Sequence, residues 1–287
     1  MTERYAAPVR FAVAIVSPPG AVHSECFREV AESLHYGLLA LGHDAVLTDR
    51  LDLNDRRTIV LGSNLLPSLG LEPPPKSILY NLEQCSDDST WITPELLRLF
   101  HRYQVWDYSQ LNIERFATRD VPRPTHVPIG YVPELTRIVP GPEDVDVLFY
   151  GSLNERRQAV LDDLRRRGLR VEWLFGAYGP VRDAWIARSK LVLNMHFYDA
   201  KVFEIVRVSY LLANRRAVVS ERGADSVEDR DLEPGVAFAD YNQLADRCVE
   251  LLSDDHARLE LAERGYQAFS ARNQAAILRR ALSADAV

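Results

Sequence analysis

A glutamate at the start of a predicted helix has the clearest chemical use in this sequence. Residues 190–207 predict a buried strand, a short polar loop and then a helix with Glu204 in its first turn. A carboxylate there can complement the positive end of the helix, or it can reach outward to the hydroxyls of a ligand. The N–H groups of the same helix start are a common seat for phosphate. Hydroxyls and phosphates together indicate a nucleotide-sugar site, and simple complementing of the helix end is the alternative.

Other polar groups of this segment lie close to the helix start. His196 and Asp199 follow the strand, while Lys201 and Arg207 flank the glutamate, where they either pair with it or contact phosphate. A lone histidine is more often structural than catalytic, but a place at the carboxyl end of a strand favours function. We therefore assign a catalytic role to His196. We assign contacts with the donor to Asn194, Lys201, Val202, Phe203 and Glu204.

A second candidate is the turn after the apolar run Val-Leu-Phe-Tyr. Gly151 and Ser152 end this predicted strand, and Asn154 is suited to cap the helix that follows. Glycine lets a backbone approach a ligand closely. Ser152 and an arginine, Arg156 or Arg157, can bond a diphosphate, with the guanidinium acting as a fork. The alternative is a tight turn followed by solvated arginines.

A third candidate is the loop after the next strand, which holds two glycines among aromatic residues. A nucleobase needs a flat apolar slot and a few hydrogen bonds from the backbone, and such a loop supplies both. We assign Gly176 and Tyr178 to the donor site. For Trp173 and Phe175 we favour packing in the core over contact with a ligand.

The fourth candidate lies in the first half of the chain, where two predicted strands end in polar residues. Asn81 and Glu83 follow one strand, and Asp107 and Ser109 end the other. Glu83 or Asp107 is a candidate general base for an acceptor hydroxyl. Asn81 and His23, which follows the first strand, are assigned to the acceptor side. The alternative is capping of the following turns, to which Asp107 and Ser109 are suited.

Apolar runs alternate with helical patterns along the whole chain. Strands are predicted at residues 9–16, 45–48, 58–61, 77–80, 103–107, 125–127, 147–150, 170–175, 190–195, 217–220 and 236–238. Helices are predicted at residues 24–41, 94–101, 110–116, 155–167, 181–188, 203–213 and 242–253, and residues 254–282 are helical. Repeated strand–helix units imply parallel sheets covered by helices. We therefore expect an α/β fold with two Rossmann-like domains that face each other across a cleft.

The domain boundaries follow from this alternation. We place an acceptor-side Rossmann-like domain at residues 1–132, a proline-rich linker at 133–146, and a nucleotide-sugar-binding Rossmann-like domain at 147–270. Residues 271–287 are expected to form a helix that can cross back to the first domain.

Composition excludes several classes of protein. The chain has 287 residues, of which 47% are hydrophobic and 26% charged, and its net charge is −7. Nucleic-acid binders need a basic face, so we expect no nucleic-acid partner. No apolar run approaches the roughly 20 residues of a membrane span, and the N-terminus does not resemble a secretory signal. Three widely spaced cysteines argue for a reducing compartment, so we expect a cytoplasmic protein without a disulfide framework.

Several segments together resemble a known family. They are the run Asp146-Val-Leu-Phe-Tyr-Gly-Ser-Leu-Asn-Glu-Arg-Arg, the Leu-Asn-Met-His strand, and Lys-Val-Phe-Glu204 before Ala217-Val-Val-Ser-Glu221. They resemble the C-terminal half of two-domain glycosyltransferases of the GT-B type, in particular the glycosyltransferase group 1 branch that includes CgeB-like spore-maturation proteins. The resemblance covers about residues 145–270, and the first domain matches only in its alternating pattern.

The resemblance implies roles for individual residues. The glutamate that matches Glu204 holds the ribose hydroxyls of the donor, and the Gly-Ser turn with Arg156 or Arg157 binds the diphosphate. Glu204 corresponds to the second glutamate of the family's Glu-x7-Glu pattern, and His196 stands in place of the first, which contacts the donor sugar. Another departure is Ser-Tyr-Leu at residues 209–211, where the family often has Ala-Cys-Gly.

The function expected from these features is transfer of a sugar from a nucleoside-diphosphate sugar to an unknown acceptor, a glycan, a small molecule or a protein. The enzyme would resemble hexosyltransferases, with retention of anomeric configuration left open. Asp144 and Asp146 have the Asp-x-Asp spacing of metal-dependent enzymes but precede a strand, so we expect no metal and no cofactor. The alternatives are a non-catalytic nucleotide-sugar-binding protein, and an epimerase or hydrolase of the same architecture.

Overall fold

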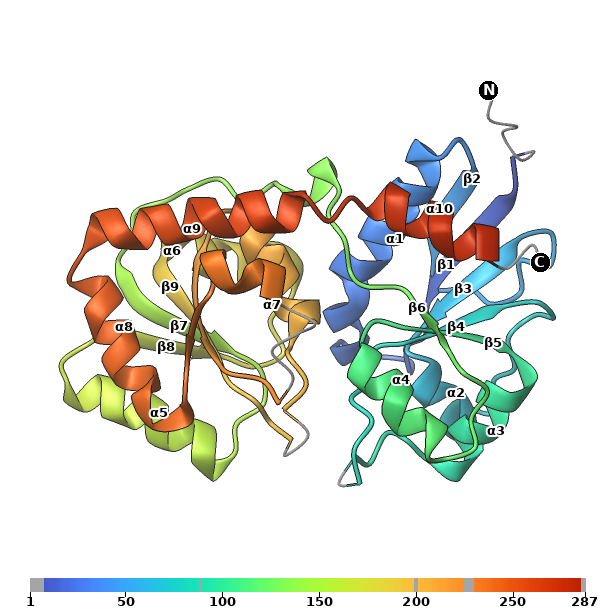
Figure 1. The fold of residues 1–287 in the computed structure, drawn as a ribbon, viewed down its shortest axis with the longest axis horizontal. Helices are drawn as coiled ribbons and strands as arrows, with labels where there is room; N and C mark the ends of the chain where they lie inside the picture. The colour runs from blue at the N-terminus through green and yellow to red at the C-terminus, as the bar shows by residue number, and fades with distance from the viewer. Residues whose placement is uncertain (1–7, 88, 199–200, 225–229, 285–287) are drawn as a thin grey trace. The chain divides into compact units, whose positions relative to one another are not determined.

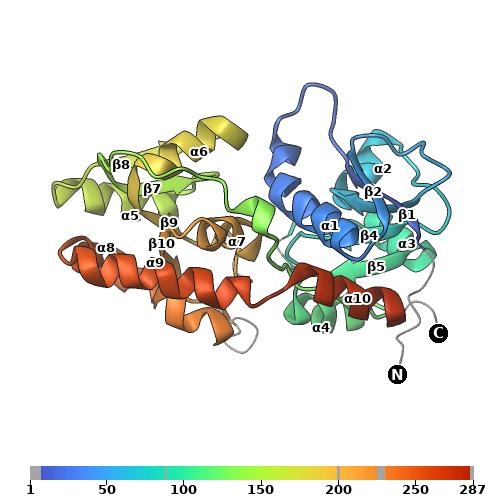
Figure 2. The ribbon, with the colours of Figure 1, turned by 90° about the horizontal axis from the view of Figure 1, so that it is seen from above.

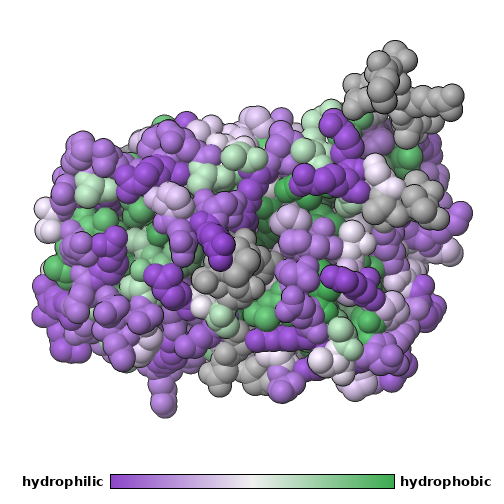
Figure 3. All heavy atoms as spheres, in the orientation of Figure 1, coloured by the Kyte–Doolittle hydropathy of each residue, from purple (hydrophilic) through white to green (hydrophobic). Residues whose placement is uncertain are grey.

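The computed structural model describes residues 8–87, 89–198, 201–224 and 230–284. Within it the chain forms two compact units (Figure 1). Unit 1 takes residues 1–85, 90–128 and 273–287, and unit 2 takes residues 86–89 and 129–272. Hydrophilic side chains cover most of the face drawn in Figure 3, with smaller groups of apolar side chains between them.

Unit 1 is built on a parallel sheet in the order β2-β1-β3-β4-β5-β6. Its strands are β1 (Arg10–Ile15), β2 (Asp44–Thr48), β3 (Arg57–Leu61), β4 (Ile78–Asn81), β5 (Gln104–Asp107) and β6 (Thr125–His126). Its helices are α1 (Arg28–Ala40), α2 (Leu66–Leu69), α3 (Pro94–Arg102), α4 (Gln110–Ala117) and α10 (Gln274–Ala284). Apolar side chains of α2, α3 and α4 share one core with alternate residues of β3, β4 and β5. Helix α1 lies beside α10 (Figure 2) and packs against β1 and β2.

Unit 2 is built on a second parallel sheet, in the order β11-β10-β9-β7-β8. Its strands are β7 (Val145–Tyr150), β8 (Val171–Leu174), β9 (Ser189–Asn194), β10 (Ala217–Glu221) and β11 (Ala237–Ala239). Its helices are α5 (Glu155–Arg166), α6 (Gly179–Arg188), α7 (Ile205–Ala213), α8 (Leu244–Leu252) and α9 (Asp255–Ser270). Helices α5, α8 and α9 contribute to a core with the inward residues of these strands.

The predicted alternation of strands and helices is confirmed, and the differences lie at particular element ends. The helix predicted from Phe203 begins at Ile205, so Glu204 is its N-cap residue and does not lie in its first turn. The first helix is preceded by a 3-10 helix at His23–Phe27. The four-residue helix α2 is absent from the sequence-based prediction because so short an apolar run shows no helical period. Strand β7 begins at Val145, inside the stretch predicted as a linker.

Candidate functional site

The order of strands in unit 2 reverses beside β7. The chain leaves β7 toward β8 on one side, and it leaves the neighbouring strand β9 toward β10 on the other, so the order reverses between β7 and β9. Ligands of open α/β sheets bind at such a switch point, outside the carboxyl ends of the strands. Gly151 follows β7 and Asn194 ends β9, which places both predicted segments at this point.

The turn after β7 is shaped around an arginine of α7. Gly151 has φ +132°, a conformation that side-chain-bearing residues rarely adopt, and a Cβ there would lie 2.8 Å from Nη2 of Arg207. The Arg207 guanidinium lies over the ring of Tyr150, 5.3 Å from its centroid. Its Nη1 donates to Oδ1 of Asn194 at 3.0 Å. The guanidinium of Arg207 beside the Gly-Ser turn is thus fixed between the ends of β7 and β9.

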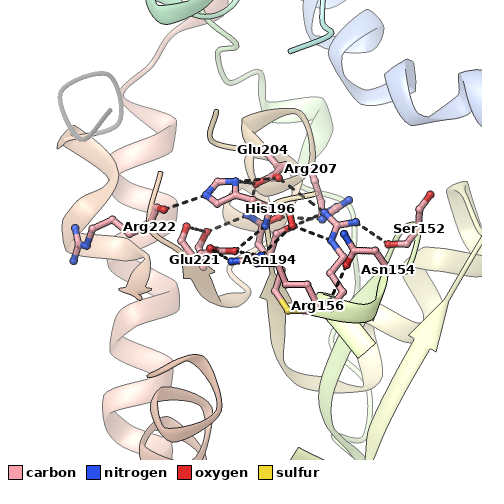
Figure 4. Close-up of polar contacts among 12 residues, drawn as sticks. Ser152, Asn154, Arg156, Asn194, His196, Glu204, Arg207, Glu221 and Arg222 are labelled. Carbon is pink, nitrogen blue, oxygen red and sulfur yellow. Dashed lines mark hydrogen bonds and ion pairs between the residues drawn. The ribbon is translucent and has the colours of Figure 1, made fainter. Parts of the chain in front are cut away.

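Glu204 turns away from the helix that it precedes. Its side chain accepts no capping hydrogen bond from α7. Its Oε2 accepts from Nδ2 of Asn194 at 2.9 Å, and Nδ1 of His196 lies 3.1 Å from both carboxylate oxygens (Figure 4). The side chain is 13% exposed. The carboxylate is therefore oriented by β9 and the loop after it, and the side chain is mostly buried.

Every polar atom of His196 has a hydrogen-bond partner. Nδ1 faces Glu204, and Nε2 faces the backbone oxygen of Arg222 at 3.2 Å. Its backbone N–H donates to Oε2 of Glu221 at 3.1 Å. Its backbone oxygen accepts from Arg156 and Arg157, each at 3.3 Å. The ring is 1% exposed and connects several segments of the site. The predicted catalytic role of His196 stays a prediction.

The His196–Glu204 pair has a defined dependence on pH. Burial lowers the pKa of His196, but the hydrogen bond and charge of Glu204 and the charge of Glu221 outweigh it, so the pKa lies above 6.5. Burial raises the pKa of Glu204, but His196, Arg207 and Asn194 bring it below 4.5. The histidine's stabilising contribution is complete below pH 6.5 and is lost as pH rises through its folded pKa. The glutamate's is complete above pH 4.5 and is lost as pH falls through its folded pKa.

The two arginines predicted to bind a diphosphate are engaged within the unit. Arg156 forms a bidentate ion pair with the buried carboxylate of Glu221 and lies 4.0 Å above the ring of Tyr241. Arg157 is 3% exposed and donates to the backbone oxygens of Ser152, Met195 and His196. Burial and the charge of Arg207 lower the pKa of Arg157 to about 10. Arg157 ties the loops after β7 and β9 together, and Arg156 neutralises a buried glutamate. Their assignment to the diphosphate stays a prediction.

The other predicted donor residues differ in exposure. Ser152 is exposed on the turn after β7, and Lys201 is exposed with its Nζ 3.9 Å from Oε1 of Glu221. The side chains of Val202 and Phe203 are buried, so only their backbone atoms are placed to meet a ligand. Asp199, named in the sequence analysis, lies outside the described residues.

The loop after β8 contradicts one interpretation and leaves another untested. Trp173 and Phe175 are 41% and 56% exposed, so they are not core aromatics as predicted. The indole N–H of Trp173 donates to the backbone oxygen of Gly151 at 2.9 Å, which ties this loop to the Gly-Ser turn. Gly176 is exposed with φ +67°, and Tyr178 is partly exposed before α6. Their assignment to a nucleobase stays a prediction.

In unit 1, Asp107 is a capping residue. It is fully buried. Its Oδ1 accepts from the N–H of Ser109 at 2.8 Å, and its Oδ2 accepts from Nδ2 of Asn81 at 2.6 Å. Asn112 donates to it as well, at 3.2 Å. Both side chains join β4, β5 and α4, as the alternative interpretation expects, and the catalytic assignment of Asp107 and the acceptor-side assignment of Asn81 stay predictions.

The assignment of Glu83 as a general base stays a prediction. Its backbone oxygen accepts from Asn81 and Asn112, which fixes the chain, and its side chain is partly buried. Burial raises the pKa of Glu83 to about 7, which is near the value that suits a base at neutral pH. His23 is exposed at the start of the 3-10 helix after β1.

Sequence reasoning did not assign Glu221 to the site. Glu221 is 65 positions from its partner Arg156, so nothing in the local pattern connects them. Arg207, one turn beyond Glu204, is expected from the sequence either to pair with Glu204 or to contact phosphate, and in the structure it bonds Asn194.

Two further findings bear on the class of protein. Among the residues that the structure describes, no cluster of three or more histidine, cysteine, aspartate or glutamate residues is arranged to hold a metal ion. No helix in the described ranges has both the length and the apolar character needed to cross a membrane.

Sequence comparison finds relatives whose names assign no activity. No family model matches the chain. One uncharacterized protein of Acanthamoeba polyphaga mimivirus is 26% identical over 243 residues, which are 79% of this chain and 32% of the relative. Another is 29% identical over 199 residues, which are 64% of this chain and 62% of the relative. The chain thus spans less than two thirds of the length of these viral relatives.

Comparison with solved structures defines the fold. HepE of Anabaena in complex with UDP-glucose has a TM-score of 0.63 and 13% identity, over 97% of this chain and all of HepE. AviGT4, a glycosyltransferase involved in avilamycin A biosynthesis, has a TM-score of 0.57 and 16% identity, over 96% of each chain. T4 phage BGT with UDP-glucose has a TM-score of 0.58 and 17% identity, over 96% of this chain and 98% of BGT.

These likenesses and the two parallel sheets show that the chain has the GT-B fold, with two Rossmann-like domains. The predicted fold class is thereby confirmed. The assignment to the CgeB-like branch stays a prediction.

Proposed function

We propose that the protein is a metal-independent glycosyltransferase that moves a sugar from a nucleoside-diphosphate sugar to an acceptor hydroxyl. The fold supports this proposal, because the structures that resemble it include glycosyltransferases and proteins solved with UDP-glucose. Fold alone does not define an activity, so the site in unit 2 has to supply the argument.

The observation that carries the proposal is the orientation of Glu204. A carboxylate that only complemented a helix end would face the N–H groups of α7, and this one instead faces Asn194 and His196. Its oxygens keep lone pairs for further hydrogen bonds, and ribose hydroxyls are donors of the right kind. The guanidinium of Arg207, which lies against Gly151, is the proposed partner of the diphosphate beside it.

The chemistry follows from the leaving group. As the bond between sugar and diphosphate breaks, negative charge grows on the diphosphate, and groups already placed there lower the barrier. Arg207 is the group proposed for this role, and the exposed Ser152 and Lys201 can add hydrogen bonds. In unit 1, Glu83 with its pKa of about 7 is the proposed base for the acceptor hydroxyl.

A non-catalytic nucleotide-sugar-binding protein is the second candidate. The burial of His196 favours it, because the position that contacts the donor sugar in the resembling family holds a ring with no free nitrogen. Turnover of UDP-glucose, with or without an added acceptor, separates the two candidates: an enzyme releases UDP and a binding protein does not.

The test of the donor site is calorimetric titration with UDP. Glu204→Ala removes the acceptor for the ribose hydroxyls, and loss of hydrogen bonds to a charged group is expected to weaken UDP binding about tenfold to 100-fold. Glu204→Gln keeps the shape of the side chain and should weaken binding less. Glu263→Ala, which removes an exposed carboxylate paired with Arg215 in the same unit, is the matched control and should bind as wild type does. UDP affinity unchanged in Glu204→Ala would overturn the ribose assignment.

A further inference from the structure

Both ring nitrogens of His196 face acceptors. Nδ1 lies 3.1 Å from each oxygen of Glu204, and Nε2 lies 3.2 Å from the backbone oxygen of Arg222. Neither partner has a proton to give when the carboxylate is ionised. A neutral imidazole carries one N–H and would leave one of these contacts without a hydrogen. The geometry therefore requires the imidazolium, which donates from both nitrogens.

We propose that His196, as an imidazolium, is a positioning residue that holds the carboxylate of Glu204 in the orientation that receives the ribose hydroxyls of the donor. This inference rests on the proposed function and replaces the idea that His196 contacts the donor sugar. One end of the ring is anchored on the chain after β10, and the other end fixes the glutamate before α7. The ring thus adds a side-chain link between two segments that are also joined by the backbone hydrogen bond from Ala224 to Lys201.

The charged groups around the ring explain why it keeps its proton. Glu204 faces Nδ1 of His196. Glu221 of β10 accepts a hydrogen bond from the backbone N–H of His196. Cations stand close as well: Arg156 and Arg157 of α5 bond its backbone oxygen. The two arginines donate hydrogen bonds to carbonyl and carboxylate oxygens. Burial also disfavours the charged form of the His196 ring. The two carboxylates outweigh the burial, so the pKa of His196 is raised.

The proposal predicts a pH dependence of nucleotide binding. Below its folded pKa the ring donates to Glu204, and above that pKa it loses one of its two hydrogen bonds. UDP affinity in the wild type is therefore expected to fall as pH rises from about 6 to about 9, with the midpoint above the ordinary histidine value.

Two substitutions test the hydrogen bonds of the two ring nitrogens one at a time. The amide nitrogen of asparagine occupies the place of Nδ1, and that of glutamine occupies the place of Nε2. His196→Asn can still donate to Glu204, so it should bind UDP within about threefold of wild type and lose the histidine's pH dependence. His196→Gln can reach Arg222 but not Glu204, and loss of one charge-assisted hydrogen bond should weaken binding about tenfold. Wild-type binding by His196→Gln together with weak binding by His196→Asn would overturn the proposal.

A measurement without ligand keeps this inference separate from the proposed function. Nitrogen-15 NMR of the His196 ring should show both nitrogens protonated at about pH 7, and Glu204→Gln should lower the ring's pKa. A neutral ring at that pH would overturn the inference whatever the protein binds. If the ring is charged and no nucleoside diphosphate binds the wild type, the charged state of His196 and its contact with Glu204 are supported, and the proposed donor site is wrong.

Discussion

At the scale of single residues, the position of Gly151 yields a prediction about ligand binding. A Cβ at this position would lie 2.8 Å from the guanidinium of Arg207, and φ of +132° is unfavourable for alanine. Gly151→Ala should therefore displace Arg207 from the turn and weaken UDP binding about tenfold, which corresponds to about 1.4 kcal/mol. Calorimetric titration with UDP measures the effect.

A second glycine provides the control for that substitution. Gly168, after α5, also has a positive φ, +85°, but a Cβ there would meet no atom within 4 Å. Gly168→Ala carries the same kind of backbone strain without moving Arg207. If both alanine variants weaken UDP binding equally, the role assigned to the Gly151–Arg207 contact is wrong.

The sequence identified the glycine, the glutamate and the asparagine of this site because each has a local signature at the end of a strand or the start of a helix. It could not show that Arg157 is buried, because its acceptors are backbone oxygens of distant loops. It likewise could not show that both nitrogens of His196 face acceptors, since one of these is the backbone oxygen of Arg222. Partners of that kind depend on tertiary structure and leave no pattern of residue types.

At the scale of elements, the buried carboxylate of Asp107 joins β4, β5 and α4. Asp107→Ala would leave the N–H of Ser109 without its acceptor and the amide of Asn81 with one bond fewer. Unpaired buried donors are expected to lower the free energy of unfolding of unit 1 by about 3 kcal/mol. Unfolding in urea, monitored by deuterium exchange in β4 and β5, measures this change in the free energy of unfolding.

The conservative variant tests the cause of that loss. Asp107→Asn keeps an acceptor oxygen for Ser109 and should lose less than half as much stability. Asp52→Ala, which removes an exposed carboxylate paired with Arg50, should change stability by less than about 0.5 kcal/mol. Equal losses in all three variants would contradict the capping role.

Elements were predicted well wherever apolar residues recur with a clear period over a full helix or strand. The ends were less accurate because polar end residues carry no periodicity: the helix predicted from Phe203 begins at Ile205. The predicted helical stretch at the end of the chain is two helices, α9 and α10, and the sequence has no glycine or proline between them to mark the break.

At the scale of the whole molecule, the chain returns to unit 1 after completing unit 2. Residues 273–287 belong to unit 1, where α10 packs against α1. A Cβ at Gly37 of α1 would lie 2.9 Å from Cδ1 of Leu278, which shows how closely the two helices approach. The first and last helices of the chain therefore contribute to the stability of one unit.

This arrangement predicts where the effect of a substitution near the C-terminus is found. Leu278 is fully buried, and Leu278→Ala should lower the stability of unit 1 by about 3 kcal/mol. Deuterium exchange should then rise in α1, β1 and β2, which are far from residue 278 in sequence, and stay unchanged in β7 and β9. Leu261→Ala in α9 is the matched control, because Leu261 lies in the core of unit 2 and should raise exchange there alone. Faster exchange throughout both units in either variant would show that the two units unfold together, and the division of stability between them would be wrong.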